Sequence, residues 1–596
     1  MTEPTEQGGA LDEPTEPTDP TVPPDPTGPG DPAELIARAR DWIAGDPDPD
    51  TRAELEALLD ADERTELAER LDAHLEFGTA GLRGIVGAGP NRMNRAVVVR
   101  TTRGLADHLL ATDPTAAQRG VIVGFDARHS SRRFAEDTVA VLAAAGIAVR
   151  WYTTPQPTPI VAFTQAHLDA AAAVVITASH NPPEYNGYKV YVEGAAQIVP
   201  PTDAAIAAAI DAVGPATEVA RADLDDPHVE VVDDQVVEDY LAALVAARPA
   251  VEGPDLTIAY TPLHGVGGEL MLRAFADGGY DDVQPEPSQC EPDGSFPTVR
   301  FPNPEEPGAM DAVVALAEDI AADLVIAHDP DADRLAAAVP DGLGGFRMLS
   351  GNQIGVLLAD HLLRGTDVER PLVVASIVST PMLRSVAAAY GARAEYTLTG
   401  FKWICAAERA LGAEGYDFVY GFEEALGSSV GTVVHDKDGI GAAVAFADLV
   451  RGLANDGQDV LDRLAELART HGLWVSRQRS ITLPGSQGLA QITDAMAGLS
   501  GRVPDDLAGH PVIAVEDYRT DVDQRPPWLA YHDLVSYELP DGRAMIRPSG
   551  TEPKVKIYVD LRVDVGVDDD LDVRTAELQD EATAVAEALA AFAGLT

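Results

Sequence analysis

Short apolar runs rich in β-branched residues alternate with longer stretches of helical periodicity along most of the chain. These runs lie at 121–125, 173–176, 256–260, 324–327, 372–377, 394–398 and 416–420. A short run that ends in turn residues predicts a buried strand, and the stretches between the runs predict helices. The pattern therefore predicts α/β units with mostly parallel sheets, in which functional residues lie beyond the carboxyl ends of strands.

The first part of the chain departs from this pattern. Residues 1–30 are mainly Pro, Thr, Asp, Glu and Gly, and such a segment buries too little apolar surface to fold, so we predict a disordered acidic tail. Asp31, Pro32 and Glu34 then form a helix-start signature ahead of an apolar helical face that ends at Gly45. A second helical segment is predicted from about 51 to 75, so that a helical preface precedes the first α/β unit.

Composition excludes several classes of protein. The chain has 596 residues and a formal net charge of −54, which argues against a nucleic-acid partner because phosphate backbones need clustered cations. No apolar run approaches the ~18 residues of a membrane span. Cys290 and Cys405 are the only cysteines, and no Lys or Arg precedes Arg38, so we expect a cytoplasmic protein without a signal peptide, a disulfide framework or a membrane partner.

Lysine is rare enough to be informative. It occurs only at 189, 402, 437, 554 and 556, whereas most of the 43 basic residues are Arg. A chain that has replaced Lys so widely would keep it where a compact ammonium is needed. The alternative is that these five lysines remain by chance. However, Lys189, Lys402 and Lys437 are among the site residues named below, and Lys554 and Lys556 end the segment 547–556 that begins with the predicted phosphate cradle.

A reactive hydroxyl is predicted after the strand at 173–176. Ser179 follows that strand, His180 is its neighbour, and the Asn-Pro-Pro and Asn-Gly pairs of residues 181–187 predict turns before Lys189. A lone Ser at such a junction is usually a turn or capping residue. Here one short segment carries a hydroxyl, a proton-transfer group and a cation, which favours nucleophilic catalysis on a phosphorylated substrate.

A metal loop is predicted after the strand at 324–327. Asp329, Asp331 and Asp333 alternate in a tight loop that Arg334 closes, which suits a hard divalent cation such as Mg²⁺. An EF-hand would need Gly and Glu at loop positions that hold Arg334 and Pro340, so a calcium loop of that type is excluded. A solvated acidic turn stays open as an alternative.

Three further segments suggest sugar and phosphate contacts. Glu423 lies in a loop bounded by glycines, where a carboxylate can accept two sugar hydroxyls. Arg547, Ser549, Gly550 and Thr551 form a compact cradle in which Arg can bind two phosphate oxygens. The glycine-rich stretch at 77–84, which contains Arg83, is a weaker sign of anion binding.

Together these motifs resemble the α-D-phosphohexomutase superfamily over residues 77–596, in the family's order of serine, metal, sugar and phosphate loops. The closest resemblance is to the phosphoglucomutase/phosphomannomutase branch that also holds phosphopentomutases. One departure is Ala425, which stands where the family's sugar loop has Ser. The resemblance implies four domains around a central cleft, namely three α/β mixed-sheet domains and a C-terminal α+β domain. The expected ranges are a helical preface at 31–76, then domains at 77–225, 226–345, 346–470 and 471–596.

The resemblance also implies a function. The chain would interconvert hexose 1-phosphate and hexose 6-phosphate, with glucose or mannose as the sugar, through a phosphoserine and a 1,6-bisphosphate. Phosphopentomutase activity is the alternative, and a metal-dependent phosphatase or a silent sugar-phosphate sensor are further ones. The implied cofactors are Mg²⁺ and glucose 1,6-bisphosphate, and the implied state is a monomer or dimer.

The resemblance assigns roles to individual residues. The catalytic set is Ser179, His180, Lys189 and Arg83, and the metal ligands are Ser179, Asp329, Asp331 and Asp333. The substrate-binding set is Arg334, Thr399, Gly400, Lys402, Glu423, Lys437, Arg547, Ser549, Gly550 and Thr551.

Overall fold

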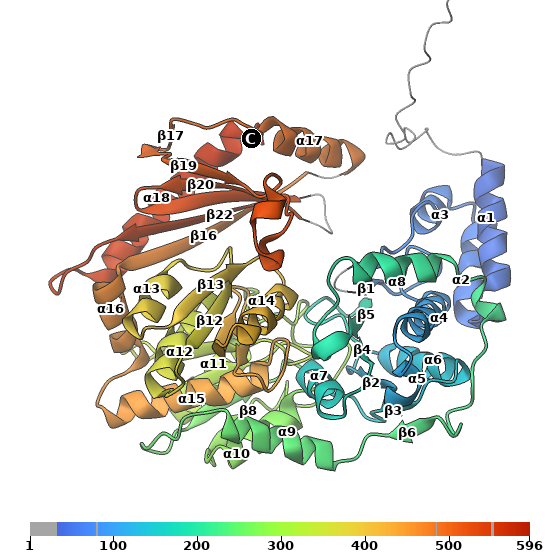
Figure 1. Cartoon of the computed structure of the whole chain (residues 1–596), viewed down its shortest axis with the longest axis horizontal. Helices are drawn as coiled ribbons and strands as arrows, with labels where there is room; N and C mark the ends of the chain where they lie inside the picture. The colour runs from blue at the N-terminus through green and yellow to red at the C-terminus, as the bar shows by residue number, and fades with distance from the viewer. Residues whose placement is uncertain (1–31, 79–80, 484, 550–553, 596) are drawn as a thin grey trace, which may run out of the picture.

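The computed structural model describes residues 32–78, 81–483, 485–549 and 554–595. Four sheet-based units follow one another along the chain, and we call them domain 1 (Leu82–Val231), domain 2 (Gln235–Met348), domain 3 (Gly351–Asn455) and domain 4 (Leu473–Phe592) (Figure 1). The predicted α/β fold class, with a C-terminal α+β domain, is confirmed. The predicted tail and the predicted site residues Gly550 and Thr551 lie outside the described residues.

Three helices precede domain 1. They are α1 (Pro32–Gly45), α2 (Pro49–Asp60) and α3 (Arg64–Leu71), and they share a small core that includes Leu35, Leu55 and Leu67. The single helix predicted from about 51 to 75 is wrong, because the chain breaks between α2 and α3. Asp62 there adopts a left-handed φ of 53°, which a continuous helix cannot contain.

Domain 1 is a six-stranded mixed sheet in the order β1-β5-β4-β2-β3-β6. Its strands are β1 (Leu82–Ile85), β2 (Val121–Phe125), β3 (Val149–Trp151), β4 (Ala172–Ile176), β5 (Tyr185–Tyr191) and β6 (Val229–Val231). Its helices are α4 (Arg95–Thr112), α5 (Ala116–Arg119), α6 (Ser131–Ala144), α7 (Thr158–His167) and α8 (Thr202–Asp211), with 3-10 turns η1 (Glu193–Ala195) and η2 (Ala216–Glu218). Strand β4 is buried at every position because helices cover both faces of the sheet.

The turn predicted at Asn186-Gly187 is wrong, because both residues lie inside β5. Gly187 is needed there for close packing rather than for a turn. A Cβ on Gly187 would lie 2.5 Å from the carbonyl oxygen of Thr177 and 2.8 Å from that of Leu82. Strand β5 therefore pairs antiparallel with both β4 and β1, and Lys189 is held in a sheet instead of a loop.

Domains 2 and 3 repeat the arrangement of domain 1. In domain 2, β7 (Ile258–Thr261), β8 (Val283–Pro285), β9 (Leu324–Ala327), β10 (Ala336–Pro340) and β11 (Phe346–Met348) accompany α9 (Gln235–Ala246), α10 (Gly268–Asp277) and α11 (Asp311–Ile320). In domain 3, β12 (Pro371–Ser376), β13 (Arg393–Thr397), β14 (Asp417–Phe422) and β15 (Ser428–Val430) accompany α12 (Gly351–Gly365), α13 (Met382–Ala389), α14 (Phe401–Ala413) and α15 (Gly439–Asn455).

The common pattern is three parallel strands and an antiparallel neighbour. The strand orders β5-β4-β2-β3, β10-β9-β7-β8 and β15-β14-β12-β13 correspond position by position. In each domain the loop that leads from the parallel strand into its antiparallel neighbour carries a predicted site motif, so the three motifs occupy equivalent places in three sheets.

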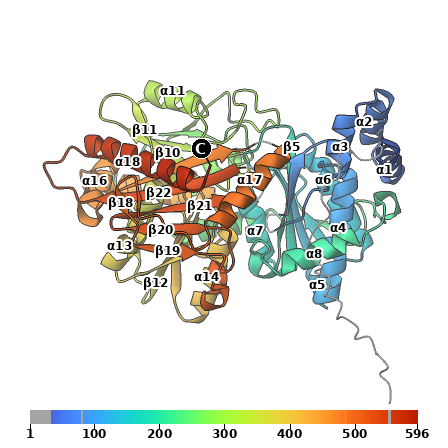
Figure 2. The same cartoon turned by 90° about the horizontal axis from the view of Figure 1, so that it is seen from above.

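Domain 4 is built differently. Helix α16 (Val460–His471) leads into an antiparallel sheet of β16 (Leu473–Thr482), β19 (Ala514–Asp517), β20 (Val535–Leu539), β21 (Gly542–Pro548) and β22 (Lys554–Val563), in the order β16-β22-β21-β20-β19. Helices α17 (Gly485–Gly498) and α18 (Leu571–Phe592) cover one face of this sheet (Figure 2). The domain also contains a short hairpin of β17 (Asp506–Leu507) and β18 (His510–Pro511) and the 3-10 turns η3 (Val522–Gln524) and η4 (Pro527–Leu529). No helix in the described part of the chain is long and apolar enough to cross a membrane.

Packing groups domains 1, 2 and 3 more closely than domain 4. One continuous buried cluster extends from Ile122 in domain 1 through Val325 in domain 2 to Phe446 in domain 3. Domain 4 has its own core and meets domain 3 through a smaller cluster that includes Leu398 and Tyr558. Domain 4 is therefore the more separable unit.

Arg543 is a buried polar link across this interface. It donates to Asp560 within domain 4 (2.8 Å) and to the carbonyl of Ser379 in domain 3 (2.6 Å). We predict that Arg543→Leu destabilises the domain 3–domain 4 unit by about 3–5 kcal/mol, because the buried Asp560 carboxylate loses its counter-charge. Calorimetric melting should show the loss, whereas Arg574→Leu, which removes an exposed pair with Glu577, should cost under about 1 kcal/mol. Equal melting of the two variants would contradict this role.

Candidate active site

Ser179 lies just beyond β4, in a strained backbone conformation. Its φ is 51°, which a residue with a side chain adopts only when its surroundings impose it. The Ser179 amide donates to Thr177 Oγ1 at 2.8 Å, and Ser179 is buried, with 4% of its surface exposed. The backbone therefore holds the hydroxyl in one direction.

Arg128 imposes that conformation, and sequence reasoning missed it. Its guanidinium donates to four carbonyls of the serine loop, those of Ser179 (2.7 Å), Asn181 (2.5 Å), Pro182 (2.6 Å) and Tyr185 (3.0 Å). Asp126 orients Arg128 from the same turn after β2. The only signal in the sequence is that Asp126 and Arg128 follow the strand predicted at 121–125, and this does not indicate which loop Arg128 binds.

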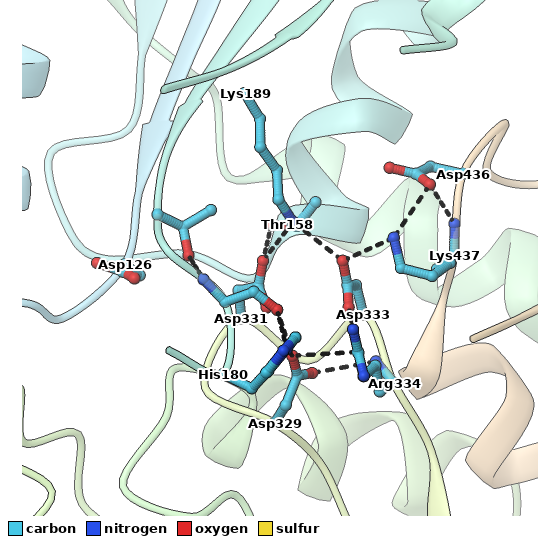
Figure 3. Close-up of polar contacts among 12 residues, drawn as sticks. Asp126, Thr158, His180, Lys189, Asp329, Asp331, Asp333, Arg334, Asp436 and Lys437 are labelled. Atoms are coloured by element: carbon cyan, nitrogen blue, oxygen red, sulfur yellow. Dashed lines mark hydrogen bonds and ion pairs between the residues drawn. The ribbon is translucent and has the colours of Figure 1, made fainter. Parts of the chain in front are cut away.

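The Ser179 hydroxyl faces the metal loop of domain 2. It donates to Asp329 Oδ2 at 2.6 Å and lies 3.2 Å from His180 Nδ1. Burial, together with the charges of Arg334 and Arg83, lowers the pKa of His180 well below its usual range. Arg83 itself donates to Asn181 Oδ1 at 3.1 Å. Ser179 and His180 therefore lie beside Asp329, which comes from a different domain. Figure 3 shows His180 next to Asp329, and Lys189 next to Asp331 and Asp333.

Two lysines from different domains neutralise the metal loop. Lys189 Nζ, on β5, donates to Asp331 Oδ2 (2.7 Å) and Asp333 Oδ2 (3.0 Å). Lys437 Nζ, in domain 3, also lies 3.0 Å from Asp333 Oδ2. These carboxylates raise the pKa of Lys189 against the effect of burial. Lys189 is thus held as an ammonium in this state, which suits charge stabilisation better than proton removal.

The remaining carboxylate oxygens fit a divalent cation. Asp329, Asp331 and Asp333 are almost fully buried and offer oxygens within 4.8 Å of one another. Oδ1 of Asp331 and Oδ1 of Asp333 are buried without a hydrogen-bond partner. Buried carboxylate oxygens that lack partners are costly, and a hard cation with oxygen ligands would satisfy them. The alternative of a solvated acidic turn is wrong, because the loop is buried.

Asp436 positions Lys437, and sequence reasoning also missed it. Its Oδ2 accepts from Tyr191 Oη of domain 1 (2.7 Å) and from Gln197 Nε2 (2.9 Å), and its Oδ1 accepts from the Lys437 amide (2.8 Å). Asp436 is buried at 1% exposure. Domains 1, 2 and 3 therefore meet in one chain of polar contacts that ends on Asp333.

The sugar-loop motif lies beside the metal loop. Glu423 follows β14 and accepts from the Gly400 amide at 2.8 Å, which joins the two predicted sugar segments. The amide of Leu335, next to Arg334, donates to the carbonyl of Leu426 at 3.0 Å. Thr399 precedes Gly400, and Lys402 lies in the first turn of α14, where burial lowers its pKa to about 8.

The phosphate-loop motif contributes Arg547 and Ser549 from domain 4. Arg547 Nη2 donates to Tyr558 Oη at 3.2 Å, whereas its buried Nε has no partner. The Ser549 amide donates to the Lys554 carbonyl at 2.8 Å across the hairpin. The positive charge of Arg547 acts on Glu424 of the sugar loop, so this motif also faces domain 3.

Four family models match the chain in order. They describe the phosphoglucomutase/phosphomannomutase α/β/α domains I (residues 74–216), II (238–342) and III (350–470) and the C-terminal domain (502–591). The chain belongs to this family. The predicted membership of the α-D-phosphohexomutase superfamily is confirmed, and so is the prediction of an isomerase that acts as an intramolecular phosphotransferase.

Individual relatives agree with this assignment. A probable phosphomannomutase of Haemophilus influenzae is 39% identical over 480 residues, which are 79% of this chain and 93% of that protein. A probable phosphoribomutase of Schizosaccharomyces pombe is 34% identical over 550 residues, 88% of this chain and 93% of that protein. The crystal structure of a phosphoglucomutase/phosphomannomutase family protein of Burkholderia thailandensis shows the same fold, with a TM-score of 0.64 and 20% identity over 86% of this chain and 97% of that chain.

The Asp loop predicts a divalent-cation site. Asp331→Asn should weaken binding of Mn²⁺, used as a probe for Mg²⁺, by about tenfold or more, because it removes an anionic oxygen ligand. Calorimetric titration of the purified chain measures this directly. Asp319→Asn, which neutralises an exposed carboxylate on α11, is the matched control and should leave the Kd unchanged. Identical Kd values for both variants would show that the triad does not bind the metal.

Proposed function

We propose that this chain is a phospho-sugar mutase that interconverts hexose 1-phosphate and hexose 6-phosphate through a phosphoserine at Ser179. The observation that carries the proposal is the contact between the Ser179 hydroxyl and Asp329 at 2.6 Å. It joins a strained, buried serine of domain 1 to the triad of domain 2, beside the sugar-loop motif of domain 3.

The proposed reaction needs no external acid or base. The bond between phosphorus and Ser179 Oγ breaks as a new bond forms to a free hydroxyl of the sugar phosphate, and the proton of that hydroxyl ends on Ser179 Oγ. His180 Nδ1, 3.2 Å from that oxygen, is placed to pass the proton. The resulting 1,6-bisphosphate then turns end for end and returns its other phosphoryl group to Ser179, with the same proton transfer reversed.

Charge stabilisation is divided among the residues around Ser179. Phosphoryl transfer depends mainly on positioning and on neutralising the charge of the equatorial oxygens. Lys189, Arg83 and Arg334 supply positive charge from two domains. Asp329, Asp331 and Asp333 would hold Mg²⁺, which would neutralise further charge when bound. After the transfer, Asp329 would accept a hydrogen bond from the Ser179 hydroxyl, as it does in this structure.

The second half of the site favours a mutase over a phosphatase or a silent sensor. A phosphatase needs the serine and the triad but has no use for a second phosphate cradle. Arg547 and Ser549 offer such a cradle from domain 4, with a buried Nε on Arg547 that lacks a partner. A sensor would have no reason to bury three carboxylates against a reactive hydroxyl, because each costs free energy to bury.

Sugar choice is proposed to depend on Glu423. When a bisphosphate turns end for end, O3 and O4 nearly exchange places, so a carboxylate that binds these two hydroxyls can serve both orientations. Glucose and mannose differ at C2 and would both be accepted. Pentose phosphates are the second candidate, because Ala425 lacks the hydroxyl expected in the sugar loop and a relative of 34% identity is named a phosphoribomutase.

Ser179→Ala tests the reaction itself. The variant should lose nearly all conversion of glucose 1-phosphate to glucose 6-phosphate while it keeps its fold, because it removes the nucleophile. Intact-mass analysis of the wild type should show one phosphate that the variant lacks. Ser288→Ala, which truncates an exposed serine, should keep full activity. Near-normal turnover by Ser179→Ala would rule out the phosphoserine, and release of free phosphate by the wild type would indicate a phosphatase.

Ala425→Ser tests the sugar loop. Because a neutral hydrogen bond contributes about 0.5–1.5 kcal/mol, the added hydroxyl should raise kcat/KM for glucose 1-phosphate relative to ribose 1-phosphate by up to about tenfold. The wild type should discriminate between glucose and mannose 1-phosphates by no more than about a hundredfold. Coupled assays across the three sugars measure both ratios. Rejection of mannose by more than about 10⁴-fold would contradict recognition through O3 and O4.

A further inference from the structure

The connection between β19 and β20 is a long loop that reaches from domain 4 onto domain 3. Trp528 of this loop is buried at 6% exposure in a cluster with Phe401 and Ile404 of α14. Its indole donates to Glu395 at 3.3 Å, and its carbonyl accepts from the Leu398 amide at 2.9 Å. The loop is therefore anchored immediately before Thr399 and Gly400, at the sugar side of the site.

His532 follows this anchor and has a buried ring nitrogen without a partner. Its amide donates to the Tyr518 carbonyl at 3.2 Å and its carbonyl accepts from the Leu534 amide at 2.8 Å, so the backbone is held at the base of the loop. The ring nitrogen Nε2 is buried and makes no hydrogen bond. A buried donor or acceptor without a partner is unfavourable, and a ligand that formed a hydrogen bond with it would remove that cost.

The surroundings of His532 identify the kind of ligand. Burial, together with the charges of Arg547 in domain 4 and Lys402 in domain 3, lowers the pKa of His532 to about 4. The Nε of Arg547 is a second buried donor without a partner. Val535 on β20 pairs with Ile546 on β21, so His532 and Arg547 lie at the same end of two neighbouring strands, and the Trp528 anchor joins their loop to the segment that leads to Lys402. Two unpartnered buried nitrogens on neighbouring strands, together with a nearby ammonium, suit the oxygens of a phosphate group.

We infer that His532 is a substrate-binding residue that donates a hydrogen bond from Nε2 to the non-reacting phosphate of the sugar phosphate. A phosphate dianion offers only acceptors, so the bound ring is the tautomer protonated at Nε2. The inference rests on the proposed function and adds a residue outside the predicted Arg547–Thr551 cradle. The same loop carries Trp528, so phosphate contact and the position of the Thr399–Lys402 segment are joined through one short stretch of backbone.

Three variants of His532 separate a hydrogen bond from a structural role. His532→Leu should raise the Kd for glucose 6-phosphate about tenfold, because a hydrogen bond to a charged group is lost. His532→Gln can place an amide nitrogen near the position of Nε2 and should stay within about threefold of the wild type. His532→Asn places its amide nearer the position of Nδ1 and should bind as weakly as His532→Leu. Tyr531→Phe, on an adjacent residue with 60% exposure, is the control.

Binding is measured by calorimetry with glucose 6-phosphate and, separately, with inorganic phosphate, and turnover by a coupled assay. KM should rise with Kd while kcat changes less than about twofold, because a contact to the non-reacting phosphate is kept through the transition state. A Kd for His532→Asn within twofold of the wild type, or equal losses in the Gln and Asn variants, would overturn the inference even if His532→Leu fails to fold.

The two probes also separate this inference from the proposed function. If wild-type turnover of sugar phosphates is normal and the His532 variants bind them unchanged, the inference fails and the proposed function stands. If inorganic phosphate binds in a His532-dependent manner but no sugar phosphate is isomerised, the proposed function fails and His532 remains a phosphate-binding residue.

Discussion

The structure depends on the burial of three carboxylates at the junction of three domains. Asp329, Asp331 and Asp333 lie within reach of a single ion, and burying such charges costs several kcal/mol each unless they are compensated. Lys189 of domain 1 and Lys437 of domain 3 provide part of that compensation. Compensation of the negative charge of the metal loop therefore depends on contacts from domains 1 and 3 to domain 2. The same arrangement places Ser179 beside Asp329.

Repetition of one sheet arrangement explains how three loops reach the same place. In each α/β domain the functional loop leaves a parallel strand and enters its antiparallel neighbour. Each of these loops also contains a non-glycine residue in the left-handed region, namely Ser179, Ala332 and Leu426. Such conformations cost about 1–3 kcal/mol each and persist where the surrounding structure imposes them. Arg128 is the visible cause at Ser179.

Domain 4 completes the site from a separate core. Its contacts to domain 3 include the Arg543 link, a small apolar cluster and the loop that carries Trp528. This attachment brings the charge of Arg547 to Glu424 of the sugar loop, while the reacting end of the site is built without domain 4. The two ends of a bisphosphate would therefore meet parts of the protein that fold around different cores.

The sequence by itself determined the features that depend only on residues close together in the chain. Strand runs, the alternate Asp residues and the order of the motifs predicted the fold class and the family, because strand periodicity and metal-ligand spacing are properties of neighbouring residues. The five lysines were informative for the same reason, since composition alone marked Lys189 and Lys437. The tertiary structure decided whatever depends on residues far apart. Arg128 and Asp436 act on segments more than 50 and 230 residues away, and His532 lies at the base of a loop whose Trp528 packs against another domain. At Asn186-Gly187 the local sequence favours a turn, but the structure has a strand. The close packing of Gly187 against two neighbouring strands outweighs the preference of the Asn-Gly pair for a turn.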